Sequence, residues 1–178
     1  MEAFEYLAKS CSVALAGITA EDRERLVSRI LSGKRIFIFG VGRSGLVGQT
    51  FAIRLVQLGL HVYFVGDMTT PIIGKDDVMI LISNTGSTMS VVRTAEIAQR
   101  LGTHVIGITS DAQSNLAKKS DTVLTVCPRN DSEMSEKAPL GTIFEDATLL
   151  FFDTIVPELM KRLGATETDM RNKHAIWV

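Results

Sequence analysis

The stretch 80–90, ILISNTGSTMS, joins the end of an apolar run to a turn rich in hydroxyl groups. The run Val78–Ile82 is typical of a buried strand, and a helical pattern begins near Met89. The hydroxyl side chains between them surround Gly86; they are Ser83, Thr85, Ser87 and Thr88. The first backbone N–H groups of a helix have no partner inside the helix, and the helix dipole favours an anion there. We therefore predict that this turn binds a phosphate group.

A simpler interpretation of the same turn is an ordinary helix cap, because Ser and Thr are also preferred capping residues. A cap needs one such residue, whereas four occur here. This surplus favours phosphate binding. Asn84 and Gly86, which lie within the turn, are then expected to contact the ligand as well.

The same alternation of strand and helix recurs on both sides of this turn. Short apolar runs predict buried strands at residues 35–39, 61–65, 78–82, 104–109 and 122–126. Amphipathic patterns predict helices between them at residues 45–58, 90–100 and 114–119. Apolar strands alternating with helices indicate an α/β fold with a single doubly wound, five-stranded parallel sheet covered on both faces. Ligands of such folds bind at the carboxyl ends of the strands.

The remaining segments extend this core into one predicted domain of residues 1–178. Residues 1–33 contain two predicted helices, 2–16 and 20–32, that either cover the sheet or pack against a neighbouring subunit, and residues 34–127 form the sheet core. Thr19, with Asp22 three residues later, is predicted to cap the second helix, and Gly33 to end it. Residues 128–139 are predicted to be a loop. Residues 140–178 contain a long helix, 143–163, that is kinked or restarted at Pro157 and stopped at Gly164, followed by a tail with a further short helix.

Composition excludes several classes of partner. The chain has 178 residues, 46% of them hydrophobic, and a net charge of -1, which does not favour nucleic-acid binding. No apolar run approaches the roughly 20 residues that cross a membrane. The two cysteines, Cys11 and Cys127, lack the spacing of a metal site, so a reducing, cytoplasmic setting is expected.

The segment 40–45, GVGRSG, matches the dinucleotide-binding pattern G-x-G-x-x-G in its proper place between a strand and a helix. Asp67, just after the second strand, is positioned to bind a ribose in that interpretation. Three features argue against NAD. Ser44 puts a hydroxyl group inside the turn, a richer anion-binding turn follows the third strand, and little chain remains for a substrate domain.

GVGRSG after the first strand, together with SNTGST after the third, resembles the sugar isomerase (SIS) domain family, whose members bind phosphosugars and have a flavodoxin-like fold. Segments 138–145 (APLGTIFE) and 171–175 (RNKHA) are similar to the 6-phospho-3-hexuloisomerases within that family, as are residues 65–67 and 70–71. The similarity spans nearly the whole chain. Residues 176–178 (IWV) depart from the polar or acidic ends that are more common in the family.

The resemblance implies an isomerase of 3-hexulose 6-phosphate and fructose 6-phosphate that needs no cofactor and no metal. It implies Glu145 as the catalytic base and His174 as a second acid–base group. The implied phosphate ligands are Ser44, Ser83, Thr85 and Thr88, assisted by Ser87. Further expected substrate contacts are Gly42, Arg43, Asn84, Gly86 and Asp67.

The resemblance also implies a homotetramer with active sites near subunit interfaces, in which His174 acts within its own subunit or on a neighbour. It further implies a role beside 3-hexulose-6-phosphate synthase in formaldehyde fixation by the ribulose monophosphate pathway.

The two catalytic candidates suit the chemistry of moving a carbonyl group along a sugar. A base that removes a C–H proton benefits from a raised pKa, and Glu145 is close in sequence to Phe144, Phe151 and Phe152. His174 titrates in the right range to move protons between sugar oxygens. The simpler interpretation treats Glu145 as a solvated acid at a helix N-terminus and His174 as a surface histidine.

Two other functions fit the same motifs. SIS domains also serve as phosphosugar sensors in regulators, although residues 1–33 are too short and not basic enough for a DNA-binding domain. Another SIS isomerase activity, such as that on arabinose 5-phosphate, is the second alternative.

Overall fold

The computed structural model describes residues 2–126 and 132–175. In chain order its elements are α1 (Glu2–Ala16), α2 (Ala20–Ser32), β1 (Ile36–Gly40), α3 (Gly42–Gln57), β2 (Val62–Phe64), β3 (Val78–Ile82), α4 (Met89–Arg100), β4 (His104–Thr109), α5 (Asn115–Lys118), β5 (Thr122–Thr125), α6 (Met134–Lys137), α7 (Thr142–Leu163) and α8 (Glu167–Asn172).

The sheet has five parallel strands, as predicted, and their order is β2-β1-β3-β4-β5. Ile36 in β1 aligns with Val62 on one side and with Val78 on the other. The chain therefore moves outward from β1 to β2 and then reverses to β3. Such a reversal is the point at which ligands bind in doubly wound sheets. It brings the turns after β1 and β3 next to each other.

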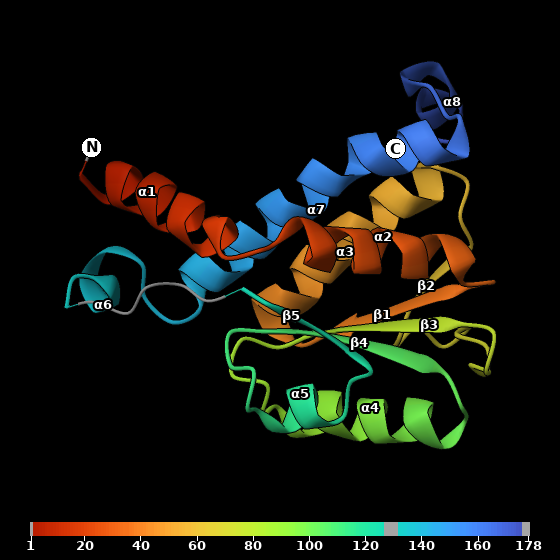
Figure 1. Cartoon of the computed structure of the whole chain (residues 1–178), viewed down its shortest axis with the longest axis horizontal. Coiled ribbons are helices and arrows are strands. Elements are labelled where there is room, and N and C mark those ends of the chain that lie inside the picture. Colours follow the sequence, from red (N-terminus) through yellow and green to blue (C-terminus); the bar gives the residue numbers. More distant parts are fainter. Residues whose placement is uncertain (1, 127–131, 176–178) are drawn as a thin grey trace.

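Helices cover both faces of the sheet (Figure 1). α3 and α7 lie over one face, with α1 and α2 packed along α7, while α4 and α5 cover the other face. Two apolar cores result, one on each side. In the larger core the rings of Phe51 in α3 and Phe152 in α7 stack with centroids 4.0 Å apart, which fixes the two helices against each other.

The helix ends follow the predicted chemistry in most places. Thr19 and Asp22 form a capping box at the start of α2, and α7 ends at Gly164, whose φ of 64° is left-handed. The new helix start considered at Pro157 is wrong, because α7 runs through this residue as one helix. Buried Val156 and Leu159 anchor it on either side of the proline.

Two predictions differ from the structure by more than one residue. The segment predicted as a loop, 128–139, contains the short helix α6, while residues 127–131, including Cys127, lie outside the described part of the chain. α3 begins at Gly42, three residues before the predicted start at Gly45. Arg43 and Ser44 consequently belong to the first turn of a helix rather than to a loop. The regular spacing of that turn directs both side chains toward α7, where they make the contacts described next.

Candidate functional site

The first turn of α3 holds the carboxylate of Glu145, which lies near the start of α7. The Ser44 hydroxyl donates a hydrogen bond to Glu145 Oε1 over 3.1 Å, and Arg43 Nε donates to Oε2 over 2.6 Å. Ser44 and Glu145 are both buried, with 7% and 8% of their surface exposed. Two residues of the GVGRSG motif therefore converge on the predicted base, one on each of its oxygens.

The surroundings of this carboxylate differ from the apolar setting expected for it. Phe151 and Phe152 are buried in the core farther along α7, where Phe152 stacks on Phe51. Phe152 lies seven residues, or about two helical turns, beyond Glu145. The carboxylate instead has a charged partner, and its hydrogen bond raises the pKa of the Arg43 guanidinium. Glu145 thus lies in a buried but polar position.

The turn after β3 is closed by pairs of hydroxyl groups. The side-chain oxygens of Ser83 and Thr88 lie 3.1 Å apart, and those of Thr85 and Ser87 lie 2.8 Å apart. Thr88 immediately precedes α4, yet its side chain makes no capping hydrogen bond. The simpler interpretation of a plain helix cap is therefore wrong for Thr88. The hydroxyls are gathered at a helix N-terminus, as a phosphate site requires.

Gly86 makes the shape of this turn possible. Its φ of 60° is left-handed, and a Cβ atom at this position would lie 2.1 Å from the Ser114 hydroxyl oxygen. The Gly86 carbonyl also accepts a hydrogen bond from the Leu116 N–H over 2.8 Å. The turn is thereby seated on the start of α5, and only glycine fits there without displacing Ser114.

Gly141, just before α7, connects the hydroxyl turn to the Glu145 carboxylate. A Cβ atom on Gly141 would lie 3.1 Å from Asn84 Nδ2 and 3.6 Å from Glu145 Oε1. Asn84 belongs to the hydroxyl turn, so this turn and the carboxylate flank the same point. Most of the predicted residues therefore form one site at the carboxyl edge of β1 and β3. Its members are Gly42, Arg43, Ser44, Ser83, Asn84, Thr85, Gly86, Ser87, Thr88 and Glu145.

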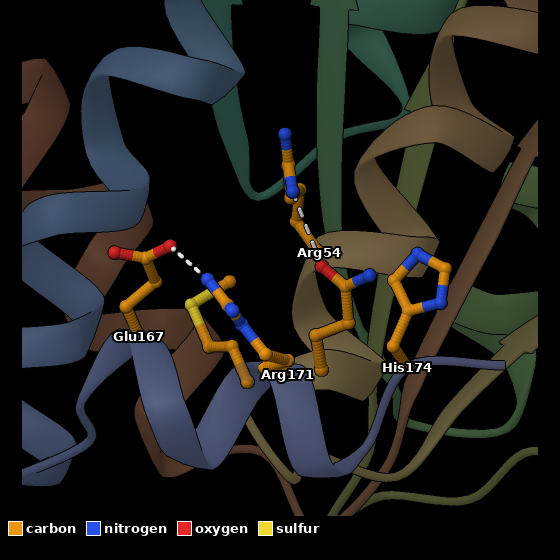
Figure 2. Close-up of a pocket in the computed structure, with 6 residues that line it drawn as sticks. Arg54, Glu167, Arg171 and His174 are labelled. Carbon is orange, nitrogen blue, oxygen red and sulfur yellow. Dashed lines mark hydrogen bonds and ion pairs between the residues drawn. The ribbon is translucent and has the colours of Figure 1, made fainter.

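His174 lies elsewhere in the chain. Its side chain is exposed and lines a hollow of about 190 Å³ between α8 and the end of α3, together with Arg54, Gln57, Glu167, Met170 and Arg171 (Figure 2). Gln57 is 13 residues after Ser44, which corresponds to about 20 Å along the helix axis. A single subunit therefore does not bring His174 to Glu145.

Asp67 also remains apart from the site residues. It follows the edge strand β2, is exposed, and forms an isolated bridge with Val65. Its backbone carbonyl accepts a hydrogen bond from the Thr70 hydroxyl over 2.7 Å. These contacts are those of a turn residue.

Sequence reasoning missed Asp146 as a member of the site. Its Oδ1 accepts a hydrogen bond from Arg43 Nη2 over 3.1 Å, so Arg43 bridges two neighbouring carboxylates of α7. The available signal was its position next to Glu145 at the start of a helix, where an acidic residue is common for other reasons.

Neither a metal site nor a membrane span is found among residues 2–126 and 132–175. No group of three or more His, Cys, Asp or Glu side chains in these ranges is arranged to hold a metal ion. No helix in the same ranges combines the length and the apolar character needed to cross a bilayer. The polar groups at the described site are hydroxyls, amides, two carboxylates and one guanidinium.

These features define an α/β protein that presents a hydroxyl-lined turn at a helix N-terminus beside a buried carboxylate, at the switch point of its sheet. The chain belongs to the SIS domain family, whose model matches residues 29–154. The resemblance drawn from the two glycine-containing turns is thus confirmed.

Similar proteins give the family more detail. A Methanocaldococcus jannaschii protein named 3-hexulose-6-phosphate isomerase is 40% identical over 151 residues, covering 85% of this chain and 81% of that protein. A Bacillus subtilis protein of the same name is 34% identical, with 98% of each chain covered. A solved structure of a hypothetical protein from Methanococcus jannaschii, described as inferring the same isomerase function, has a TM-score of 0.90 at 34% identity and 100% coverage of both chains.

Proposed function

We propose that this SIS-domain isomerase interconverts 3-hexulose 6-phosphate and fructose 6-phosphate. The observation that carries the proposal is the position of Glu145, buried next to an anion-binding turn and held by the first turn of α3. A phosphate held by Ser83, Thr85, Ser87 and Thr88 anchors one end of the sugar. The similarity to relatives named for this reaction supports the choice of substrate.

The reaction moves a carbonyl group from C3 to C2 through a 2,3-enediol. Glu145 removes the C2 proton of the 3-ketose, the electron pair forms the C2–C3 double bond, and O3 takes a proton. Loss of the O2 proton then restores a carbonyl group at C2, and Glu145 returns a proton to C3. One carboxylate can serve both carbons if the enediol stays on one face. Arg43 and backbone N–H groups near the turn are suitable donors to the negatively charged oxygen of the intermediate.

A second group must move protons between O2 and O3, and we assign this role to His174. Because His174 lies at the far end of α3 in its own subunit, the assignment requires a second copy of the chain. The exposed side of α3 carries Leu46, Ile53 and Val56, which are 61%, 57% and 45% exposed. A stripe of this kind on a helix is suited to packing against another subunit.

A two-fold axis near the middle of α3 would pair this helix with its copy in antiparallel orientation. Contacts across a two-fold axis are reciprocal, so the Ser44 end of one α3 would meet the Gln57 end of the other. The α8 segment packs at the Gln57 end, where Lys173 approaches Gly59. This arrangement carries His174 toward the partner's site. We extend the proposal to a homotetramer with active sites near subunit interfaces.

The chemistry of the substrate restricts what His174 does. In a 3-ketose 6-phosphate, O6 carries the phosphate and O5 could close only a four-membered ring onto C3, so the substrate is open-chain. No ring-opening acid is needed in that direction. We assign His174 to the enediol oxygens rather than to a ring oxygen. A His174→Gln variant that lost activity on cyclic fructose 6-phosphate but isomerised the 3-ketose normally would contradict this assignment.

The proposed reaction gives the protein a place in metabolism. It would consume the product of 3-hexulose-6-phosphate synthase in the ribulose monophosphate pathway of formaldehyde fixation, in the cytoplasm. The competing functions are a phosphosugar sensor without activity and an isomerase of arabinose 5-phosphate. The paired contacts of Ser44 and Arg43 on Glu145 favour an enzyme, because a sensor has no use for a positioned base.

A direct assay distinguishes these functions. The purified protein is given arabino-3-hexulose 6-phosphate, arabinose 5-phosphate and other aldose phosphates, and the ketose products are measured. We expect turnover of the 3-hexulose phosphate at a kcat/KM at least about 100-fold above that of any aldose phosphate, since a site shaped for one carbonyl position discriminates by several kcal/mol. Preferred turnover of an aldose phosphate would reassign the substrate. Binding without turnover would favour the sensor.

A further inference from the structure

Both oxygens of the Glu145 carboxylate accept hydrogen bonds from side chains of the first turn of α3. Ser44 donates to Oε1 and Arg43 donates to Oε2, and the second contact is the shorter and the charged one. A charge-assisted hydrogen bond of 2.6 Å at the reacting oxygen competes with acceptance of a proton from carbon. The carboxylate would be a better base if Arg43 withdrew while the Ser44 contact stayed.

Arg43 is free to make such a movement. Its side chain is 59% exposed, whereas that of Glu145 is 10% exposed. Arg43 also uses a different nitrogen for each partner, Nε for Glu145 and Nη2 for Asp146. The guanidinium can therefore release Glu145 through Nε and remain attached to Asp146 through Nη2. Among the described residues, Glu145 and Asp146 are the ion-pair partners of Arg43.

We propose that Asp146 is a positioning residue that anchors Arg43 while its Nε passes from Glu145 to an anionic oxygen of the bound sugar phosphate. The base is then uncovered only when substrate occupies the site. This inference rests on the proposed function and adds a role for a residue at that same site.

The electrostatics favour this exchange. Arg43 compensates the buried charge of Glu145, which would otherwise be left without a cation. A sugar phosphate brings further negative charge to the hydroxyl turn, and Asn84 of that turn lies beside Gly141 within reach of Glu145. Arg43 is then attracted to the ligand, and Asp146 limits how far it travels. Without the anchor, a long and mostly exposed side chain samples many positions, which lowers the fraction of complexes with the correct arrangement.

The experiment compares Asp146→Asn with Asp153→Asn, a change two turns along the same face of α7. Asp153 is 51% exposed and lies 3.8 Å from Arg54 in an ion pair of its own, which makes it a matched control. Asn keeps the shape of Asp146 and its capacity to accept a hydrogen bond, but removes the charge. We expect Asp146→Asn to lower kcat about tenfold with KM changed less than about threefold, because the anchor sets the fraction of bound complexes in which Glu145 is uncovered more than it sets the affinity for the substrate. Asp146→Glu should recover part of the loss, and Asp153→Asn should stay within about twofold of the parent.

A second measurement follows Arg43 directly. The Nε–H resonance of ¹⁵N-labelled arginine, assigned by its disappearance in Arg43→Lys, should shift when fructose 6-phosphate saturates the protein. In Asp146→Asn this resonance should broaden in the presence of ligand. An unchanged resonance at full saturation, with binding verified by calorimetry, would overturn the inference. Equal kinetics of the Asp146 and Asp153 variants would overturn it as well.

These readouts separate the inference from the proposed function. If the protein turns over no 3-hexulose phosphate but the Arg43 resonance shifts with fructose 6-phosphate, the reaction is wrong and the exchange of Arg43 stands. If turnover is normal and the resonance does not move, the reaction stands and the exchange is wrong. A protein that binds no fructose 6-phosphate at all contradicts both.

Discussion

The two ends of α3 lie next to the two predicted catalytic groups, whose settings are very different. At its first turn, Ser44 and Arg43 contact a buried Glu145 through short hydrogen bonds. At its last turn, Arg54 and Gln57 face the exposed His174 across an open hollow (Figure 2). At the first end the carboxylate and both of its donors come from one subunit, whereas the described residues around His174 at the other end include no buried carboxylate.

This difference suits two separate roles at the two ends of α3, proton transfer at carbon by Glu145 and proton transfer between oxygens by His174. A base needs a fixed position and a controlled charge, which burial provides. If His174 acts on a neighbouring subunit, as proposed, its exposure in the single chain is the expected state. The predictions below test this division, starting with the largest effect.

The buried end should tolerate the least change in charge. Glu145→Gln keeps one acceptor oxygen, for either Ser44 or Arg43, but removes the base, so we expect kcat to fall by about 10³-fold. The measurement is the initial rate of 3-hexulose 6-phosphate isomerisation. Glu158→Gln is the matched control, because Glu158 lies on the same helix and pairs with Arg162 at the surface. A Glu145 variant with more than a third of the parental rate would remove Glu145 from the mechanism.

Substitution at the exposed end should have a smaller effect on kcat, and His174 should act on the site of another copy. We expect His174→Gln to lower kcat by about 10²-fold, since proton transfer between oxygens can partly pass through water. When Glu145→Gln and His174→Gln proteins are mixed and allowed to exchange subunits, activity should rise above that of either protein alone. Each mixed pair would contain one site with both intact groups. Failure of activity to recover, with exchange verified by mass spectrometry, would place His174 in its own subunit or outside the mechanism.

In the proposed assembly, contact between the middle parts of two α3 helices brings the Ser44 end of one copy to the Gln57 end of the other. Ile53→Arg places a charge in the exposed apolar stripe, and we expect the assembly to dissociate and the activity to drop at least about tenfold on dilution. Light scattering measures the mass of the assembly, and assays at several protein concentrations measure the loss of activity on dilution. Ile97→Arg is the control, because Ile97 is 43% exposed on α4, across the sheet. An unchanged mass for the Ile53 variant would move the interface away from α3.

The hydroxyl turn beside the buried end depends on the backbone of Gly86. Gly86→Ala should lower the free energy of unfolding by about 2 kcal/mol and raise KM, because the new methyl group meets Ser114 and φ is positive. Gly42→Ala is a useful comparison for stability, since Gly42 has the same φ of 60° but no atom within 4 Å of its added Cβ. It should cost only about 1 kcal/mol of strain. Urea unfolding measures both, and an equal loss would show that the Ser114 contact is unimportant.

The smallest effect concerns an ion pair far from either end of α3. Hydrogen bonds from Arg162 lower the pKa of Glu24 to about 2, compared with its ordinary value of 4.5. A lowered pKa in the folded state stabilises the protein above the unfolded value, and this contribution is lost as the pH falls from about 4.5 toward 2. We expect the Tm to fall slightly less steeply in this range for Glu24→Gln than for the parent. Because both side chains are at the surface, high salt should weaken the difference.

Much of the fold could be predicted from the sequence because local signals agreed with each other. Apolar runs of five or six residues, three of them followed by an amphipathic pattern, predicted all five parallel strands, and β3 and β4 were predicted with the observed bounds. Thr19 and Gly164 marked helix ends through chemistry that acts over a few residues. The start of α3 was predicted three residues late, because Gly42 and Gly45 are residues typical of a loop and hid the pattern of the first helical turn.

The sequence by itself also determined which residues belong to the ligand turns, because hydroxyls and glycines at strand ends have a local physical meaning. Only the tertiary structure decided the partners of those residues. It joined Arg43 to both Glu145 and Asp146 across more than a hundred positions, and it separated His174 from Glu145 along the length of α3. Distances between segments depend on how helices pack over the sheet, and that packing is a sum of many contacts that no short motif encodes.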